Sequence, residues 1–321
     1  MTVHARERGA ALLTVLLLVA IMATVAATAL SRVGIGTHLA ANAATVGQGR
    51  AWLESAELLA STRVEDLLAA SKEKTVGAGW LGLERRVLFP GGAAVRARIE
   101  DGGNCFNLNS LVREQDDGRL VARPQAVNQF VDLMMMLGIS QSDAGRIAAS
   151  ASDYIDSDSV PQNLGAEDGG KILPPNQLMA DPSELRAVAG VTDRHYGLLS
   201  RWICALPKPE LSEINVNTLL PEQAPLIAML APGRINPPRA RAAIEQRPAA
   251  GFDDALDFWQ LPMLAGIELP SGAVDQVKVR TSFFMLKARV ESSDIDVRET
   301  ALIDARTAPA RVIRRSWSDA S

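Results

Sequence analysis

The chain has 321 residues, of which 22% are charged and 4% aromatic, and its formal net charge is −4. This negative balance excludes the general electrostatic attraction that draws basic proteins to nucleic acid or to anionic lipid. The length suggests two domains, and the sequence contains no repeat array and no long low-complexity tract.

An abrupt change from charged to apolar residues marks the N-terminus. The charged run 6–9 ends in Gly9, Ala10 opens an apolar segment, and the next charged residue is Arg32. As a helix, residues 10–31 would span roughly 33 Å at about 1.5 Å per residue, enough for a hydrocarbon core of about 30 Å. Because arginines precede this segment, the positive-inside rule predicts a cytoplasmic N-terminus and a body across the membrane.

This junction resembles the type IV prepilin leader, which a dedicated peptidase cleaves after the glycine. The resemblance implies that Gly9 and Ala10 flank the processing site and that the apolar helix stays on the mature protein. Two alternatives are a secretory signal peptide, with a small-residue cleavage site between Ala23 and Ala29, and a plain signal anchor. Helical character continues to about residue 70, which favours the prepilin interpretation.

Beyond that helix, the periodicity predicts strands, then a large helical block, then more strands. Strand patterns occur near 86–89, 94–100 and 106–109, and again at 274–279, 283–290 and 298–303. The most economical arrangement is one α+β domain whose sheet is completed by the C-terminal strands, with the helical block as an insertion. Three consecutive methionines, 134–136, are expected in a helix core rather than on an adaptable binding surface.

Short motifs follow one another in a specific order along nearly the whole chain. They lie at 8–17, 51–57, 98–101, 106–111, 153–158, 165–168, 183–186 and 214–218. Together they resemble the K-type minor pseudopilins of the type II secretion system. The resemblance implies a type IV pilin-like α+β fold, in which a long N-terminal helix packs on a small antiparallel sheet and a large α-helical domain is inserted between strands.

The resemblance also implies the organisation of the chain and its place in the cell. The expected units are a leader (1–9), the membrane-spanning helix with the first part of a pilin-like domain (10–109), the inserted α-helical domain (110–273), C-terminal strands that complete the pilin-like domain (274–306), and a disordered tail (307–321). The protein would be anchored in the inner membrane by one helix, with its body in the periplasm.

The implied function is that of a minor pseudopilin at the tip of the periplasmic pseudopilus. It would nucleate assembly with the I- and J-type minor pseudopilins and support protein export across the outer membrane. Other implied partners are further pseudopilus subunits, the prepilin peptidase, secreted substrates and the outer-membrane secretin.

The fifth residue of the expected mature chain supports a tip position. Most pilins carry a glutamate there, which is thought to pair with the N-terminal amine of the preceding subunit, whereas this chain has Thr14. A subunit with no earlier neighbour needs no such partner, and an unpaired carboxylate in lipid would cost energy. The alternative is that Thr14 is simply a tolerated membrane residue.

Acidic residues gather in a stretch rich in proline and glycine. They are Asp153, Asp156, Asp158, Glu167 and Asp168. Closely spaced carboxylates suit calcium, which takes about six to eight oxygen ligands at about 2.3–2.6 Å. The EF-hand pattern is absent, and from the residues alone a solvated acidic loop is the alternative. The family resemblance implies a structural Ca²⁺ ion that cross-links this loop.

The two cysteines, Cys105 and Cys204, would lie in an oxidising compartment. A disulfide between them would close a loop of about 100 residues, worth about 4–5 kcal/mol in the chain-entropy model. The alternative is a pair of buried free thiols. The distance between the Cα atoms decides, since a disulfide requires less than about 7 Å.

The segment 213–219 resembles the start of a helix-hairpin-helix module, which makes a DNA-uptake or pilus-associated binding protein the alternative function. However, residues 211–275 contain four arginines and no lysine against eight acidic residues. That balance opposes nucleic-acid binding, so no nucleic-acid partner is expected and the module is interpreted as a protein-interaction scaffold. We find no nucleophile elbow, phosphate loop or paired-cysteine metal motif, and therefore expect no enzymatic activity.

Overall fold

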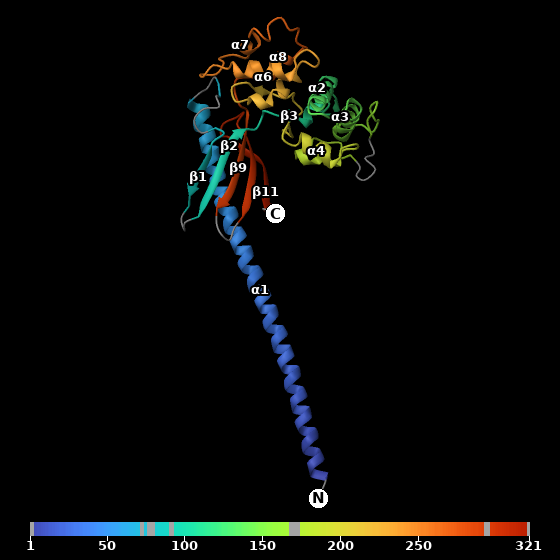
Figure 1. Cartoon of the computed structure of the whole chain (residues 1–321), viewed down its shortest axis with the longest axis vertical. Helices are drawn as coiled ribbons and strands as arrows, with labels where there is room; N and C mark the ends of the chain where they lie inside the picture. The colour runs from blue at the N-terminus through green and yellow to red at the C-terminus, as the bar shows by residue number, and fades with distance from the viewer. Residues whose placement is uncertain are drawn as a thin grey trace.

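The computed structural model describes residues 3–70, 74–75, 81–89, 93–166, 174–291 and 296–319. It consists of a long N-terminal helix, a five-stranded antiparallel sheet and a helical body (Figure 1). The helical body lies at the end of the molecule opposite the N-terminus, and the sheet lies between this body and the free part of the helix.

Helix α1 (Val3–Ala70) changes character along its length. Residues 11–33 are exposed on every face, and this is the segment of the described chain that is long and apolar enough to cross a membrane. Farther along, Leu53, Ala56, Ala60 and Val64 recur at helical spacing and are buried against the sheet. The first part of α1 therefore suits lipid, while the second part forms the helical layer of the pilin-like domain.

The sheet joins strands from both ends of the chain. In spatial order it contains β1 (Glu84–Leu88), β2 (Ala94–Asp101), β9 (Phe283–Glu291), β10 (Val297–Asp304) and β11 (Arg311–Asp319), all antiparallel to their neighbours. Alternate residues such as Val95, Leu286 and Ile303 face α1 and form its core with the helix. Because β2 and β9 are adjacent, the chain between them leaves and re-enters the sheet at the same end.

The prediction of a disordered C-terminal tail is wrong. Residues 307–321 are expected to be disordered, but Arg311–Asp319 forms β11 and pairs with β10 along its length. The strand pattern is hidden because Arg315, on the side that faces α1, finds an acidic partner in Glu57 of the helix. The strand expected at 274–279 is also partly wrong, since a helical turn precedes the two-residue strand there.

The helical body contains short elements around one apolar core. Its helices are α2 (Pro124–Met136), α3 (Gln141–Ile155), α4 (Asp193–Leu199), α5 (Pro225–Ala228), α6 (Pro237–Glu245), α7 (Ala255–Trp259) and α8 (Ala273–Gln276), with 3₁₀ turns η1 (Leu108–Leu111), η2 (Pro182–Ala187) and η3 (Pro221–Gln223). Prolines begin several of them, where a missing N–H removes no helical hydrogen bond.

Short strand pairs hold the body together. β3 (Phe106–Asn107) pairs with β6 (Ile203–Cys204), β4 (Val112–Glu114) with β5 (Leu120–Ala122), and β7 (Ile214–Asn215) with β8 (Val277–Lys278). The Phe106 and Phe130 rings stack with their centroids 4.6 Å apart in the core. Of the three methionines, Met134 is fully buried as expected, whereas 42% of Met135 is exposed.

Candidate functional site

The membrane half of α1 satisfies its polar side chains internally. The Thr14 hydroxyl donates to the carbonyl of Ala11 at 2.8 Å, and Thr24 and Thr28 make the same kind of bond one turn back. A hydroxyl bonded in this way needs no water or partner in lipid, unlike a carboxylate. The Gly9–Ala10 peptide lies inside the continuous helix, so cleavage there would leave the rest of α1 on the protein.

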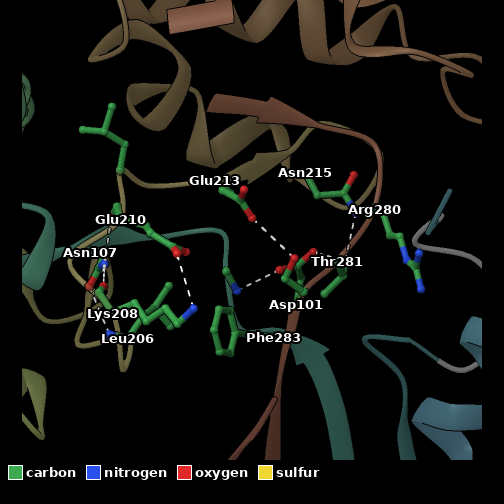
Figure 2. A pocket seen from close by; sticks show the side chains of 13 residues that line it. Asp101, Asn107, Leu206, Lys208, Glu210, Glu213, Asn215, Arg280, Thr281 and Phe283 are labelled. Carbon is green, nitrogen blue, oxygen red and sulfur yellow. Dashed lines mark hydrogen bonds and ion pairs between the residues drawn. The ribbon is translucent and has the colours of Figure 1, made fainter. Parts of the chain in front are cut away.

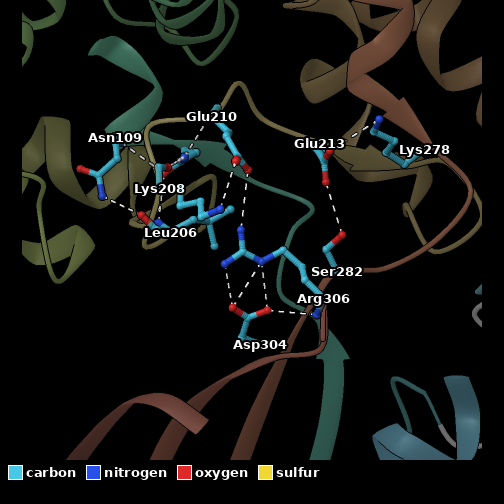
Figure 3. A network of polar contacts seen from close by, with 10 residues as sticks. Asn109, Leu206, Lys208, Glu210, Glu213, Lys278, Ser282, Asp304 and Arg306 are labelled. Carbon is cyan, nitrogen blue, oxygen red and sulfur yellow. Dashed lines mark hydrogen bonds and ion pairs between the residues drawn. The ribbon is translucent and has the colours of Figure 1, made fainter. Parts of the chain in front are cut away.

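Asparagines of the 106–111 and 214–218 motifs lie at the joint between the helical body and the sheet, and those of the first motif bond loops of the body to one another. The buried Asn107 amide donates to the carbonyls of Lys208 and Glu210, both at 3.0 Å, and its oxygen accepts from the Leu206 N–H at 3.0 Å. Asn109 makes a further three bonds, two with the backbone of Met179 and one with the Leu206 carbonyl, and Figure 3 shows the bond to Leu206. We call these amides struts, because each buried side chain forms hydrogen bonds to several backbone groups of neighbouring loops and so holds the loops together.

The second motif makes equivalent contacts on the other side of the joint. The Asn215 amide donates to the Thr75 carbonyl at 3.2 Å and to the Thr281 hydroxyl at 2.9 Å. The side chain of Asn217 bonds both the N–H and the carbonyl of Phe252, at 2.7 and 3.0 Å. The Asn-x-Asn spacing, present in both motifs, is the sequence signal that points to these struts, although it does not reveal their partners.

Asp101, at the end of β2, lies at the centre of the joint in a cavity of about 20 Å³ (Figure 2). Its carboxylate accepts hydrogen bonds from the hydroxyls of Thr218, at 2.6 Å, and Thr281, and from the Gly103 N–H at 2.8 Å. Burial raises the pKa of Asp101, and these donors oppose that rise. The residue therefore connects the sheet, through β2, to the loop that opens the helical body.

An ion-pair network continues the joint beside Asp101. Arg306 binds the Asp304 carboxylate at 2.7 Å and reaches Glu210 at 3.7 Å (Figure 3). Its guanidinium also lies over the Phe283 ring. Glu210 belongs to the helical body, whereas Asp304 ends β10. The arginine therefore bridges the two parts through side chains that are far apart in sequence.

The cysteines lie at the same joint and are bonded to each other. Cys105 and Cys204 form a disulfide with Cα atoms 5.8 Å apart. Cys105 directly precedes β3 and Cys204 ends β6, and both pack with Leu206, Phe283 and Leu302, which come from the body and the sheet. The crosslink thus fixes the base of the helical body where it contacts β9 and β10.

The acidic stretch is only partly described. Asp153 is fully buried, and its carboxylate accepts from the Gln162 N–H at 3.1 and 3.2 Å. Asp156 is also buried where α3 ends, while Asp158 is exposed and accepts from the Val160 N–H at 2.8 Å. Glu167 and Asp168 lie outside the described residues.

The surroundings of Asp153 show how closely its loop packs. A Cβ on Gly165 would come within 1.9 Å of a carboxylate oxygen of Asp153, so glycine is required there. Burial raises the pKa of Asp153, and the charge of Asp158 adds to the rise. Within the described ranges, no three His, Cys, Asp or Glu side chains converge as a metal cluster. The oxygen-only donors and the like-charge crowding nonetheless fit a hard cation such as calcium.

A buried charge cluster, which no local pattern in the sequence indicates, connects α1 to the sheet. Glu57 of α1 accepts two hydrogen bonds from Arg315 of β11, at 2.6 and 2.7 Å. Glu299 of β10 has a fully buried side chain, accepts from the Trp317 indole N–H at 3.1 Å and lies 3.7 Å from Arg315. Burial, and then the proximity of Glu57, raises the pKa of Glu299 to about 7.

Comparisons with known proteins agree on one family. Two family models, both described as type II secretion system protein K, match residues 104–208 and 214–280. A type II secretion system protein K of Dickeya chrysanthemi is 30% identical over 97% of this chain and 97% of its own length. The chain belongs to the type II secretion system protein K family. A relative from Klebsiella pneumoniae is 32% identical and covers 81% of each chain.

A solved structure extends the similarity to the fold of this K-family chain. In the GspK-GspI-GspJ complex of enterotoxigenic Escherichia coli, one chain matches with a TM-score of 0.73 and 28% identity, over 85% of this chain and 96% of that chain. The predicted α+β, type IV pilin-like fold is confirmed. The protein is a minor pseudopilin of type II secretion, with a single-pass inner-membrane anchor and a periplasmic body.

The 214–218 motif, which carries the helix-hairpin-helix resemblance, lies at the joint between the body and the sheet. The asparagines of the 214–218 motif direct their amides to Thr75, Thr281 and Phe252, inside the protein. A DNA-uptake function is not favoured, because the family models cover this segment with a secretion protein.

Proposed function

We propose that the protein caps the tip of the pseudopilus and nucleates its assembly with I- and J-type minor pseudopilins. The observation that carries the proposal is the position of the helical body, which forms the end of the molecule remote from α1's N-terminus (Figure 1). A body inserted between β2 and β9 occupies the end of the sheet where the next subunit would stack. The name of the similar complex, which joins GspK to GspI and GspJ, supports the choice of partners.

The N-terminal helix supports the same position. Its fifth mature residue, Thr14, bonds its own helix and offers no carboxylate to the amine of an earlier subunit. A first subunit has no such neighbour to bind. Prepilin peptidase would process the chain at Gly9, and further pseudopilus subunits, secreted substrates and the outer-membrane secretin would meet it later. Its work is binding and mechanical positioning rather than catalysis.

Site-specific photo-cross-linking in assembled pseudopili tests the tip position. A cross-linker at Leu58 of α1, 71% exposed, is expected to capture other pseudopilins, while one at Leu256 of the helical body, 51% exposed, should capture no pseudopilus subunit stacked beyond it. A ladder of products with the major pseudopilin from the Leu256 position would contradict the proposal, because it requires subunits on both sides.

A structural calcium ion is part of the proposed function. The ligands proposed for it are Asp153 in the last turn of α3 and the acidic residues that follow this helix, Asp156, Asp158, Glu167 and Asp168. When bound, the ion would supply positive charge that draws these carboxylates together. The buried position of Asp153 supports this role, because its negative charge lies near that of Asp158, and the groups that stabilise it are the backbone N–H groups of Gln162 and Ala166.

A further inference from the structure

A groove crosses the helical body on the side formed by α2. It encloses about 600 Å³, within the size range of small-ligand sites. One wall is α2 and the other is formed by loops after α5 and before α8. The lining includes Asn128, Asp132, Met135, Pro232, Arg234 and Pro270. Helices α2 and α8, which lie beside the groove, belong to the end of the molecule opposite the N-terminus of α1 (Figure 1).

The carboxylate of Asp132 is the chemical feature of this groove. The side chain is half-buried, and throughout the described ranges it has no hydrogen bond and no ion pair. Burial raises the pKa of Asp132, because nothing compensates the carboxylate for the water it has lost. Arg234 on the opposite wall is held by the carbonyl and, at 3.1 Å, the carboxylate of Glu268. A cationic group of a bound partner would give the Asp132 carboxylate the ion pair that the described part of this chain does not provide.

Amide hydrogen bonds brace the walls of the groove, and part of its lining is apolar. Gln129 and Gln276 exchange hydrogen bonds at 2.8 and 3.3 Å, and Gln125 donates to the Ser271 carbonyl at 3.1 Å across the groove. Beside Asp132 on α2, Met135 is 42% exposed. Braced walls lower the entropy lost on binding, and an exposed methionine adapts to different apolar partners.

We propose that this groove binds an extended peptide segment of a partner protein, with a lysine or arginine side chain on Asp132 and an adjacent apolar side chain on Met135 and the prolines. The exposed amide of Asn128 is placed to bond the peptide main chain. One carboxylate is too few for a calcium or magnesium ion, which needs several oxygen ligands. The same carboxylate repels nucleic-acid phosphate.

The test uses the full chain in lipid nanodiscs and fluorescein-labelled peptides. The probe is Gly-Ser-Leu-Lys-Leu-Ser-Gly, compared with versions that carry glutamate or norleucine in place of lysine, and binding is followed by fluorescence anisotropy. We expect saturable binding of the lysine peptide. Asp132→Asn should weaken it by about tenfold, the loss expected when one charge-assisted hydrogen bond is removed. Asp132→Lys should reverse the preference and select the glutamate peptide.

Two further variants locate the binding. Asn128→Trp, at an exposed position of α2, should fill the groove and abolish binding, whereas Asp116→Asn, in the turn between β4 and β5, should leave it unchanged. Equal affinity of Asp132→Asn and the parent, full binding to Asn128→Trp, or no saturable binding of the lysine peptide would each overturn the proposal. A different result would also overturn it: the protein binds no peptide but self-associates, and Asp132→Lys abolishes this self-association. A second copy of the chain would then occupy the groove.

Discussion

The buried carboxyl of Glu299 should make stability fall as the pH rises. Its pKa is raised from an ordinary value of 4.5 to about 7, so the folded protein keeps a proton that the unfolded chain releases. Between these two values the unfolded state binds fewer protons, and the free energy of unfolding must decrease with pH. Below pH 4.5 the effect of Glu299 is absent, and above pH 7 it is complete.

The size of this effect follows from the pKa difference. The interval from 4.5 to about 7 is 2.5 pKa units, and at about 1.36 kcal/mol per unit it corresponds to an upper limit of about 3 kcal/mol. Arg315 beside it is 33% exposed, so solvent screening reduces the expected change to about 1–2 kcal/mol. Glu57 does not cancel it, because hydrogen bonds and the charge of Arg315 outweigh burial and lower its pKa, which places its own transition below this window.

Glu299→Gln isolates the contribution of this carboxyl. The amide keeps an oxygen for the Trp317 indole N–H but does not titrate. Melting temperatures of the full chain in detergent, measured between pH 5 and 8 at constant calcium, should fall by about 3–6 °C more in the parent than in the variant. Glu114→Gln, at an exposed glutamate of β4, should follow the parent. Parallel curves for the parent and Glu299→Gln would refute the buried-carboxyl reasoning.

Four further outcomes are expected. Gly9→Val should leave an unprocessed precursor, whereas mass spectrometry of the parent should find Ala10 as the first residue; a start near residue 30 would contradict prepilin processing. Chelation of calcium should lower the melting temperature of the parent, since an ion that binds only the folded state stabilises it by mass action, and identical curves with and without calcium would argue against the site. Reduction of the Cys105–Cys204 bond, whose ends are 99 residues apart, should cost about 2–5 kcal/mol of unfolding free energy; two thiols titrated in the unfolded, unreduced protein would show that the bond is absent. Asn215→Ala should cost about 2–3 kcal/mol because it leaves buried partners at Thr75 and Thr281 unsatisfied, and a loss below about 0.5 kcal/mol would contradict its role as a strut.

Much of the architecture follows from local patterns in the sequence. The charge-free segment after Ala10 identifies the anchor, and the helical spacing of Leu53, Ala56 and Ala60 predicts the face that packs on the sheet. The alternation within 94–100 and 283–290 predicts the two central strands, because their inward residues are apolar. The C-terminal strands complete the sheet begun by the N-terminal strands, as predicted. The physical reason is that an unpaired inner strand would leave its backbone N–H and C=O groups without hydrogen bonds.

The candidate site was less predictable, because its residues acquire their roles from distant partners. The motifs 106–111 and 214–218 can be recognised in the sequence, but it does not show that Asn107 and Asn109 bond loops of the body, or that Asn215 connects the body to Thr281 just before β9. It also offered no reason to single out Asp101, whose Thr281 partner is 180 residues away. Whether Glu167 and Asp168 approach Asp153 stays a prediction, since they lie outside the described residues.

The sequence by itself determined the anchor, the class of the fold and the order of its parts, because each is encoded by a periodicity or a run within a few tens of residues. Only the tertiary structure decided which polar residues are buried and with what. Arg315 looks like one charge in a polar tail until Glu57, 258 residues earlier, meets it across the sheet. Asp132 looks like an ordinary helix-surface aspartate until loops from two other parts of the chain enclose it. Burial depends on contacts between distant segments, and local sequence patterns do not encode those contacts.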